Sequence, residues 1–136
     1  MSAAETRALI ERYYAAFNAG DAEGMLACLA EDAVHDVNQG PRRIGRPAFA
    51  AFCAHMARCY RETLSEMVIM VAPDGRRAAA EFIVDGTYLA TDEGLPEARG
   101  QTYRLPAGAF LAVQDGAITR VTTYYNLKDW EAQVLG

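Results

Sequence analysis

Hydrophobic residues in the first 60 positions recur with the period of an α-helix in three segments. The first segment runs from about Ala4 to Ala19, and Asn18-Ala19-Gly20 is typical of a helix end. Asp21 can cap a second helix, Ala22 to about Ala30, and Pro47 suits the first turn of a third. The expected apolar stripes are Leu9, Ile10, Tyr13, Tyr14 and Phe17 in the first helix, Met25, Leu26 and Leu29 in the second, and Phe49, Phe52, Cys53, Met56 and Tyr60 in the third.

Strand patterns dominate the second half of the chain, where turn-forming sequences separate alternating apolar and polar positions. A short strand is expected earlier, at about Ala33 to Asn38, followed by the loop Gln39-Gly40-Pro41-Arg42-Arg43. The later turns are Pro73-Asp74-Gly75-Arg76, the polar loop Thr91 to Gly100 and the hairpin signal Asp115-Gly116. The expected strands are Ser65 to Ala72, Arg77 to Ala90, Gln101 to Gln114 and Ala117 to Tyr125, and Asn126 can cap a last helix, Leu127 to Leu135.

This order of elements predicts an α+β fold. Hairpin-linked strands with the helices gathered on one side form two layers around one core. A chain of 136 residues without a repeat or an internal linker suits a single domain, residues 1–136.

Composition and charge exclude several classes of protein. The net charge of −5 argues against a nucleic-acid surface, which needs a basic patch, and the adjacent arginines in the expected turns are interpreted as solvated. No apolar run is long enough to span a membrane, and the N-terminus lacks the apolar core of a signal peptide. We therefore expect a cytoplasmic protein that binds neither nucleic acid nor membrane.

No metal or cofactor site is expected from the spacing of the possible ligands. Cys53 and Cys59 are six residues apart, and nothing in the sequence ties His35 or His55 to a cysteine. The three cysteines, Cys28 among them, are interpreted as small buried hydrophobic residues. Neither a phosphate-binding loop nor a Gly-x-Ser-x-Gly nucleophile motif is present.

The segment Glu11 to Gly45 resembles the family of nuclear transport factor two, ketosteroid isomerase and SnoaL-like polyketide cyclases. Arg-Tyr-Tyr-Ala-Ala-Phe-Asn-Ala-Gly-Asp, Leu-Ala-Glu-Asp-Ala-Val and Ile-Gly-Arg-Pro-Ala-Phe stand in family order, and the closing strand Ile118 to Asn126 adds to the resemblance. The resemblance implies a cone-shaped barrel, in which a strongly curved, mostly antiparallel sheet wraps around the N-terminal helix. It also implies a cavity open at one end and usually a homodimer. This fold hosts many activities.

The residues of ketosteroid isomerase transfer to this chain only in part. The tyrosine that donates to the oxyanion falls on Tyr13. The general-base aspartate falls on Val37, one residue after Asp36, and the second oxyanion donor falls on Gly108. Because that mechanism needs a base and two donors at one enolate oxygen, standard steroid isomerase activity is not expected.

The strand Val34 to Asn38 carries the candidate bases. Alternation places His35 and Val37 on one face and Asp36 and Asn38 on the other, and the sequence leaves open which face points inward. His35 would accept a proton near neutral pH, whereas Asp36 would need its pKa raised by an apolar wall. The alternative is that the inward residue only satisfies hydrogen bonds in a binding cavity.

Other side chains are candidates for contact with a ligand, although core packing is the more common role of such residues. Tyr13 is either a core aromatic or a donor to a substrate carbonyl. Glu81 and Asp85 share a strand face, which is more typical of a solvent or dimer face than of an acid–base pair or a cation site. The expected ligand-binding residues are Tyr14, Asn38, Phe52, Met56, Tyr124, Asn126 and Trp130.

Three functional hypotheses follow. The first is a cofactor-independent isomerase, cyclase or dehydratase that abstracts a proton next to the carbonyl of a small apolar compound. In this hypothesis the base is His35 or Asp36, and Tyr13 is the hydrogen-bond donor. The substrate is oriented by Asn38 or Asn126. The second is a non-catalytic pocket that binds a small apolar molecule. The third is a dimeric interaction module that uses the open sheet face.

Overall fold

Helices and strands succeed one another in the computed structural model, which describes residues 1–38 and 40–136. Gln39, which the sequence places in a loop, lies outside the described residues. In chain order the elements are α1 (Ala3–Asn18), α2 (Ala22–Ala27), β1 (Leu29–Val37), β2 (Arg43–Ile44), α3 (Arg46–Cys59), β3 (Tyr60–Val71), β4 (Arg77–Tyr88), β5 (Thr102–Gln114), β6 (Ala117–Tyr125) and α4 (Leu127–Leu135).

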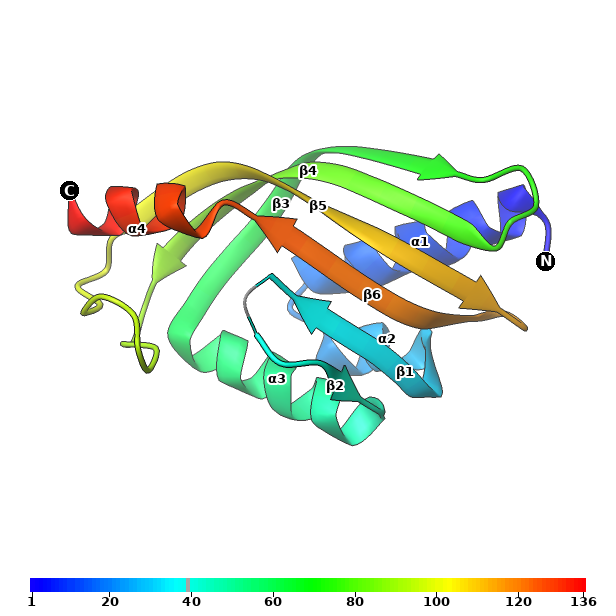
Figure 1. Cartoon of the computed structure of the whole chain (residues 1–136), viewed down its shortest axis with the longest axis horizontal. Helices are drawn as coiled ribbons and strands as arrows, with labels where there is room; N and C mark the ends of the chain where they lie inside the picture. Colours follow the sequence, from blue (N-terminus) through cyan, green and yellow to red (C-terminus); the bar gives the residue numbers. More distant parts are fainter. Residues whose placement is uncertain (39) are drawn as a thin grey trace.

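The strands form one sheet in the order β2-β1-β6-β5-β4-β3. Neighbours are antiparallel except β1 and β6, which run parallel. The sheet curves in front of α1 and α2, α3 lies beside β1 and β2, and α4 lies at the end opposite the N-terminus (Figure 1). The expected α+β fold with a strongly curved, mostly antiparallel sheet is confirmed, and the sheet is open rather than a closed barrel.

Helix α1 has a defined start and a tethered end. The Ser2 hydroxyl accepts from the Glu5 amide while the Glu5 carboxylate accepts from the Ser2 amide, which satisfies two amides of the first turn. At the other end, the Asn18 side chain donates to the Leu64 carbonyl (2.9 Å) and accepts from the Leu64 amide (2.8 Å). Gly20 follows with φ +68°, a conformation that glycine adopts without strain.

The strand register decides which side chains face the helices. His35, Val121, Leu111 and Ala78 are cross-strand neighbours on β1, β6, β5 and β4, and all are buried. The next row, Asp36, Thr122, Phe110 and Ala79, faces the opposite way, and Phe110 is 52% exposed. The first row therefore lies on the concave face of the sheet and the second on the convex face.

Three strands differ from the expectation, and one of them, β1, begins at Leu29, where the second helix was expected to continue to about Ala30. β3 begins at Tyr60 rather than Ser65, and its register shifts between Ser65 and Val68, where Glu66 has φ +52°. This bulge interrupts the alternation, so the sequence pattern shows only the second half of the strand. The two-residue strand β2 falls partly in an expected loop, because its conformation depends on pairing with β1.

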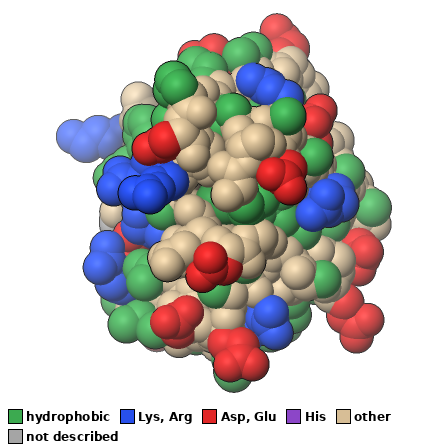
Figure 2. Space-filling view, turned by 90° about the vertical axis from the view of Figure 1, so that its right-hand side faces the viewer, with side chains coloured by type: hydrophobic (Ala, Val, Ile, Leu, Met, Phe, Trp, Pro, Cys, Tyr) green, Lys and Arg blue, Asp and Glu red, His purple; other side chains and the backbone are tan. Residues whose placement is uncertain are grey.

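Two further features of the molecule concern its surface and the lengths of its helices. The view in Figure 2 shows acidic, basic and hydrophobic side chains interspersed on the end of the molecule nearest the N-terminus. Among the described helices, none is both long and apolar enough to cross a lipid bilayer.

Candidate functional site

The concave face carries a histidine between two phenyl rings. His35 on β1 is only 4% exposed. Its ring centroid lies 4.5 Å from that of Phe49 and 4.7 Å from that of Phe52, both on α3. Helix α3 is held against β1 by Arg46, whose guanidinium donates to the Leu29 carbonyl (2.6 Å and 3.1 Å). The wall around this imidazole is therefore aromatic.

Arg43 lies beside His35 because the two residues are partners in the β1–β2 ladder. The Arg43 guanidinium carbon lies 4.7 Å from the centroid of the Phe52 ring, in a cation–π arrangement. Among the described residues, the Nδ1 atom of His35 and the Nη1 atom of Arg43 are the buried side-chain polar atoms without a hydrogen-bond partner. Such an atom costs about 1–3 kcal/mol, so these two atoms, on residues paired across the β1–β2 ladder, are candidates to bind a polar group of a ligand.

The His35 imidazole is neutral at physiological pH. Burial, the main cause, and the positive charge of Arg43 lower its pKa to about 4, and the charge of Asp36 opposes the shift. A neutral imidazole has one nitrogen that carries a proton and one with a lone pair that can accept one. His35 can therefore act as a proton acceptor.

The sequence left open whether His35 or Asp36 points inward from β1, and in the structure Asp36 lies on the convex face. Its carboxylate accepts two hydrogen bonds from Arg42, at 2.8 Å and 2.9 Å, and one from the Thr122 hydroxyl at 3.0 Å. The hydrogen bond from Arg42 is the main reason why the pKa of Asp36 is lowered rather than raised. The structure thus brings His35, and not Asp36, to the concave face.

Tyr13 and Tyr14 approach the same region from α1. The Tyr13 ring lies 6.4 Å from Phe49 and 5.0 Å from Tyr14, edge to face, and Tyr14 packs at 5.6 Å from Phe82. Burial raises the pKa of both phenols, so both stay protonated and can donate. Tyr13 and His35 therefore share Phe49 as a neighbour.

An aromatic cluster that includes Trp130 closes the end of the concave face near α4. Tyr60 and Tyr88 stack at 5.4 Å, and the Trp130 ring lies 5.0 Å from Tyr88 and 5.9 Å from Tyr103. The Tyr103 hydroxyl donates to the Glu62 carboxylate (2.5 Å) on β3, and burial raises the pKa of Glu62. Glu62 is not among the residues predicted from the sequence, because it lies in the part of β3 that was not expected to be a strand.

The expected ligand-binding residues do not all lie together. Phe52 contacts His35, and Met56 is half-buried on α3. Asn38 follows the end of β1 with φ +34° and accepts a hydrogen bond from the Tyr125 amide.

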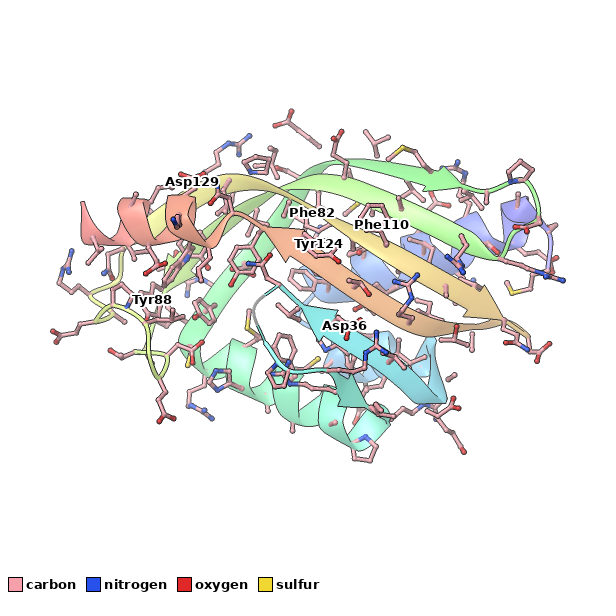
Figure 3. All side chains as sticks on the ribbon, viewed as in Figure 1. Asp36, Phe82, Tyr88, Phe110, Tyr124 and Asp129 are labelled. Atoms are coloured by element: carbon pink, nitrogen blue, oxygen red, sulfur yellow. The ribbon has the colours of Figure 1, made fainter. Side chains whose placement is uncertain are left out.

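Tyr124 and Asn126 have surroundings other than the His35 ring. Tyr124 is 53% exposed on the convex face, where its ring lies 6.1 Å from Phe110 (Figure 3), and alternation along β6 turns it away from His35. Asn126 caps α4 by accepting from the Asp129 amide.

One group of side chains in the described residues could hold a metal ion. His55, Cys59 and Asp92 each offer a ligand atom, and these atoms lie within 4.8 Å of one another. This cluster was not predicted from the sequence, and the fold brings its three residues together.

Comparison with known proteins gives the family. The model of the SnoaL-like domain matches residues 10–121. A protein from Silicibacter sp. TM1040, provisionally named a polyketide cyclase, is 62% identical, with 98% of each chain covered and a TM-score of 0.94. A protein of the same provisional name from Pseudomonas putida KT2440 is 60% identical, with 98% of each chain covered and a TM-score of 0.93.

More distant similarity concerns the fold alone. A nuclear transport factor two-like protein from Burkholderia xenovorans LB400 is 19% identical over 98% of each chain, with a TM-score of 0.76. Among curated proteins, no sequence matches. Because the family model spans most of the chain, the protein belongs to the SnoaL-like domain family and has the nuclear transport factor two-like fold.

Proposed function

We propose that this protein is an enzyme of the cyclase or isomerase type that abstracts a proton next to the carbonyl group of an apolar compound. Membership of the SnoaL-like family and the provisional name of relatives 60% and 62% identical support this reaction class. The observation that carries the proposal is the pair of buried, unpartnered nitrogen atoms, Nδ1 of His35 and Nη1 of Arg43. One can accept a proton and the other can donate a hydrogen bond.

The proposed reaction begins when the neutral His35 ring takes a proton from the carbon next to the carbonyl. The Arg43 guanidinium and the Tyr13 hydroxyl donate to the oxygen, where the negative charge of the enolate develops. In a cyclisation, the enolate carbon then attacks a second carbonyl of the same molecule, and the imidazolium returns its proton to the new alkoxide. In an isomerisation, the proton returns to another carbon. Every atom in these steps comes from the substrate and the side chains.

The surroundings of His35 suit this chemistry. Its pKa of about 4 gives it roughly the basic strength of a carboxylate, whose ordinary pKa is about 4. The Phe49 and Phe52 rings exclude water and favour an apolar substrate. The Arg43 charge, which lowers the pKa of His35, would be offset by an enolate oxygen beside it. The negative enolate therefore offsets the repulsion between Arg43 and the imidazolium that forms when His35 takes the proton.

The test follows the exchange of α-protons of an apolar aryl ketone, 2-tetralone, in D₂O by NMR. We expect the protein to accelerate the exchange, and His35→Gln to reduce the acceleration at least about 100-fold, because general bases contribute about 10²–10⁴-fold. Arg43→Met, which keeps an apolar stem without the charge, should also reduce it. Asp36→Asn on the opposite face is the matched control and should leave the rate within about threefold of wild type.

A ligand pocket without turnover is the second candidate, since the same two unpartnered atoms would suit a bound carbonyl compound. It is distinguished by saturable binding of 2-tetralone that His35→Gln weakens, with exchange at the background rate. Exchange that is equal in wild type and His35→Gln would contradict the catalytic proposal.

A further inference from the structure

A second cluster of chemically active side chains lies where α3 passes into β3. His55 and Cys59 are four residues apart on α3, a spacing that places both side chains on one face of the helix. Asp92 comes from the loop after β4. One ligand atom from each of these three residues lies within 4.8 Å of the others.

Backbone and phenol hydrogen bonds fix the loop that carries Asp92. The Leu89 amide donates to the Cys59 carbonyl (2.7 Å), which joins the loop to the end of α3. The Asp92 amide donates to the Tyr88 hydroxyl (2.9 Å), and the Tyr60 hydroxyl donates to the Asp92 Oδ2 atom (2.7 Å). The carboxylate is thus held in one orientation with its other oxygen, Oδ1, directed at His55.

The spacing of the atoms fits two ligands of one metal ion. His55 Nε2 and Asp92 Oδ1 are 2.9 Å apart. Two tetrahedral ligands with bonds of about 2.0–2.1 Å lie about 3.3 Å apart, so a small movement of the His55 ring would admit the ion. A thiolate, an imidazole and a carboxylate together are the donor set that Zn²⁺ takes in proteins.

We propose that His55, Cys59 and Asp92 bind a divalent zinc-type cation, with water in the fourth position. His55 is 36% exposed, so the cation can enter from solvent, while the buried Cys59 closes the inner side. Tyr60 is the outer partner that orients the carboxylate, as such partners do in metal sites. The proposed metal site shares no residue with the site around His35, and it does not depend on the proposed reaction.

The hydrogen bonds of His55 show which of its ring nitrogens carries the proton, and therefore which protons must move when the cation binds. Arg58 can only donate, so its contact with His55 Nδ1 (2.9 Å) makes that nitrogen an acceptor and leaves the ring proton on Nε2, facing Asp92. When the cation binds Nε2, this proton transfers to Nδ1 and Arg58 moves away into solvent. The Cys59 thiol gives its proton to solvent as the bond from Sγ to the cation forms. Binding therefore releases one proton and competes with Arg58.

The experiment titrates ZnCl₂ into the metal-free full-length protein by calorimetry, and CoCl₂ while the thiolate-to-cobalt absorption is recorded. We expect one equivalent to bind, with an affinity that rises about tenfold from about pH 6 to about pH 7 because one proton is released. His55→Ala, Asp92→Asn and Cys59→Ser should each weaken binding at least tenfold, since even the loss of an outer partner costs about 10–100-fold. Arg58→Ala should strengthen it.

Matched controls separate this site from general thiol or histidine binding. Cys53→Ser lies on the same helix outside the cluster, and His35→Gln lies on the concave face; both should bind zinc as wild type does. His55→Ala changes a half-exposed residue, so it tests the site even if Cys59→Ser does not fold. The proposal is overturned if the wild type binds no zinc, or if His55→Ala and Cys53→Ser bind it equally.

Discussion

At the scale of single residues, folding and protonation of His35 oppose each other. Phe49 and Phe52 enclose the imidazole, and Arg43 lies beside it. An imidazolium there would lose hydration and meet a like charge, which is why the pKa is about 4 in the folded protein against an ordinary 6.5. Between these two values the unfolded chain binds a proton that the folded protein does not.

This difference predicts how stability changes with pH. Because the unfolded state binds more protons in the window from about pH 4 to about pH 6.5, the free energy of unfolding should rise with pH there. The burial of neutral His35 should lower the free energy of unfolding by on the order of 3 kcal/mol at low pH. The full loss is reached below about pH 4, and there is no loss above about pH 6.5. Urea unfolding at a series of pH values should show a smaller slope in His35→Gln than in wild type. Equal slopes would contradict the burial of a neutral His35.

At the scale of elements, Asn18 joins the end of α1 to the middle of β3. Its amide makes both possible hydrogen bonds with the backbone of Leu64, just before the bulge at Glu66. The bulge bends β3, and α1 lies against the concave face that the bend creates. This side chain thus helps to fix the position of Tyr13 and Tyr14 relative to the sheet.

Replacement of Asn18 should loosen this join. Asn18→Ala removes both bonds and leaves the Leu64 amide without its partner, so we expect a loss of about 1–3 kcal/mol in the free energy of unfolding. NMR hydrogen exchange should show faster exchange at the Leu64 amide. Glu11→Ala, on the exposed side of the same helix, should stay within about 0.5 kcal/mol of wild type. A change in Asn18→Ala no larger than in Glu11→Ala would show that the join is dispensable.

Short sequence motifs were enough to predict the turns and the helix ends that depend on neighbouring residues alone. Asp115-Gly116 forms the expected turn with positive φ at both residues, and α1 ends where Asn18-Ala19-Gly20 predicted, within one residue. Arg43 and Glu62 were missed because the strands that carry them depend on pairing with distant segments and on a bulge. His55 and Cys59 could have been paired by their spacing, but Asp92 is 37 residues from His55 and no local pattern connects them.

At the scale of the whole molecule, the convex face exposes large apolar side chains. Val68 and Met70 on β3, Phe110 on β5 and Tyr124 on β6 are each about half exposed. Strand register places Met70 and Phe110 on opposite sides of Ala79, and Phe110 lies beside Tyr124 (Figure 3). An apolar area of this kind favours association, and we propose that a second copy of the chain covers it by two-fold symmetry.

The proposed dimer is tested by replacing its centre. Phe110→Asp should convert a dimer into a monomer, because two carboxylates would be buried at the symmetric contact without partners. Size-exclusion chromatography with light scattering measures the mass directly. Ile44→Asp is the matched control, because Ile44 is 64% exposed on β2 and distant in sheet order from β5. A wild-type mass of one chain would contradict the proposal.

The parallel pairing of β1 with β6 has a consequence for biosynthesis. The ribosome delivers His35 well before its neighbour Val121, since Asp36 and the adjoining Thr122 are 86 positions apart. A nascent chain therefore holds β1 without its parallel partner until β6 has been synthesised. A prematurely terminated product that lacks β6 would expose the apolar side of β1 to chaperones and proteases.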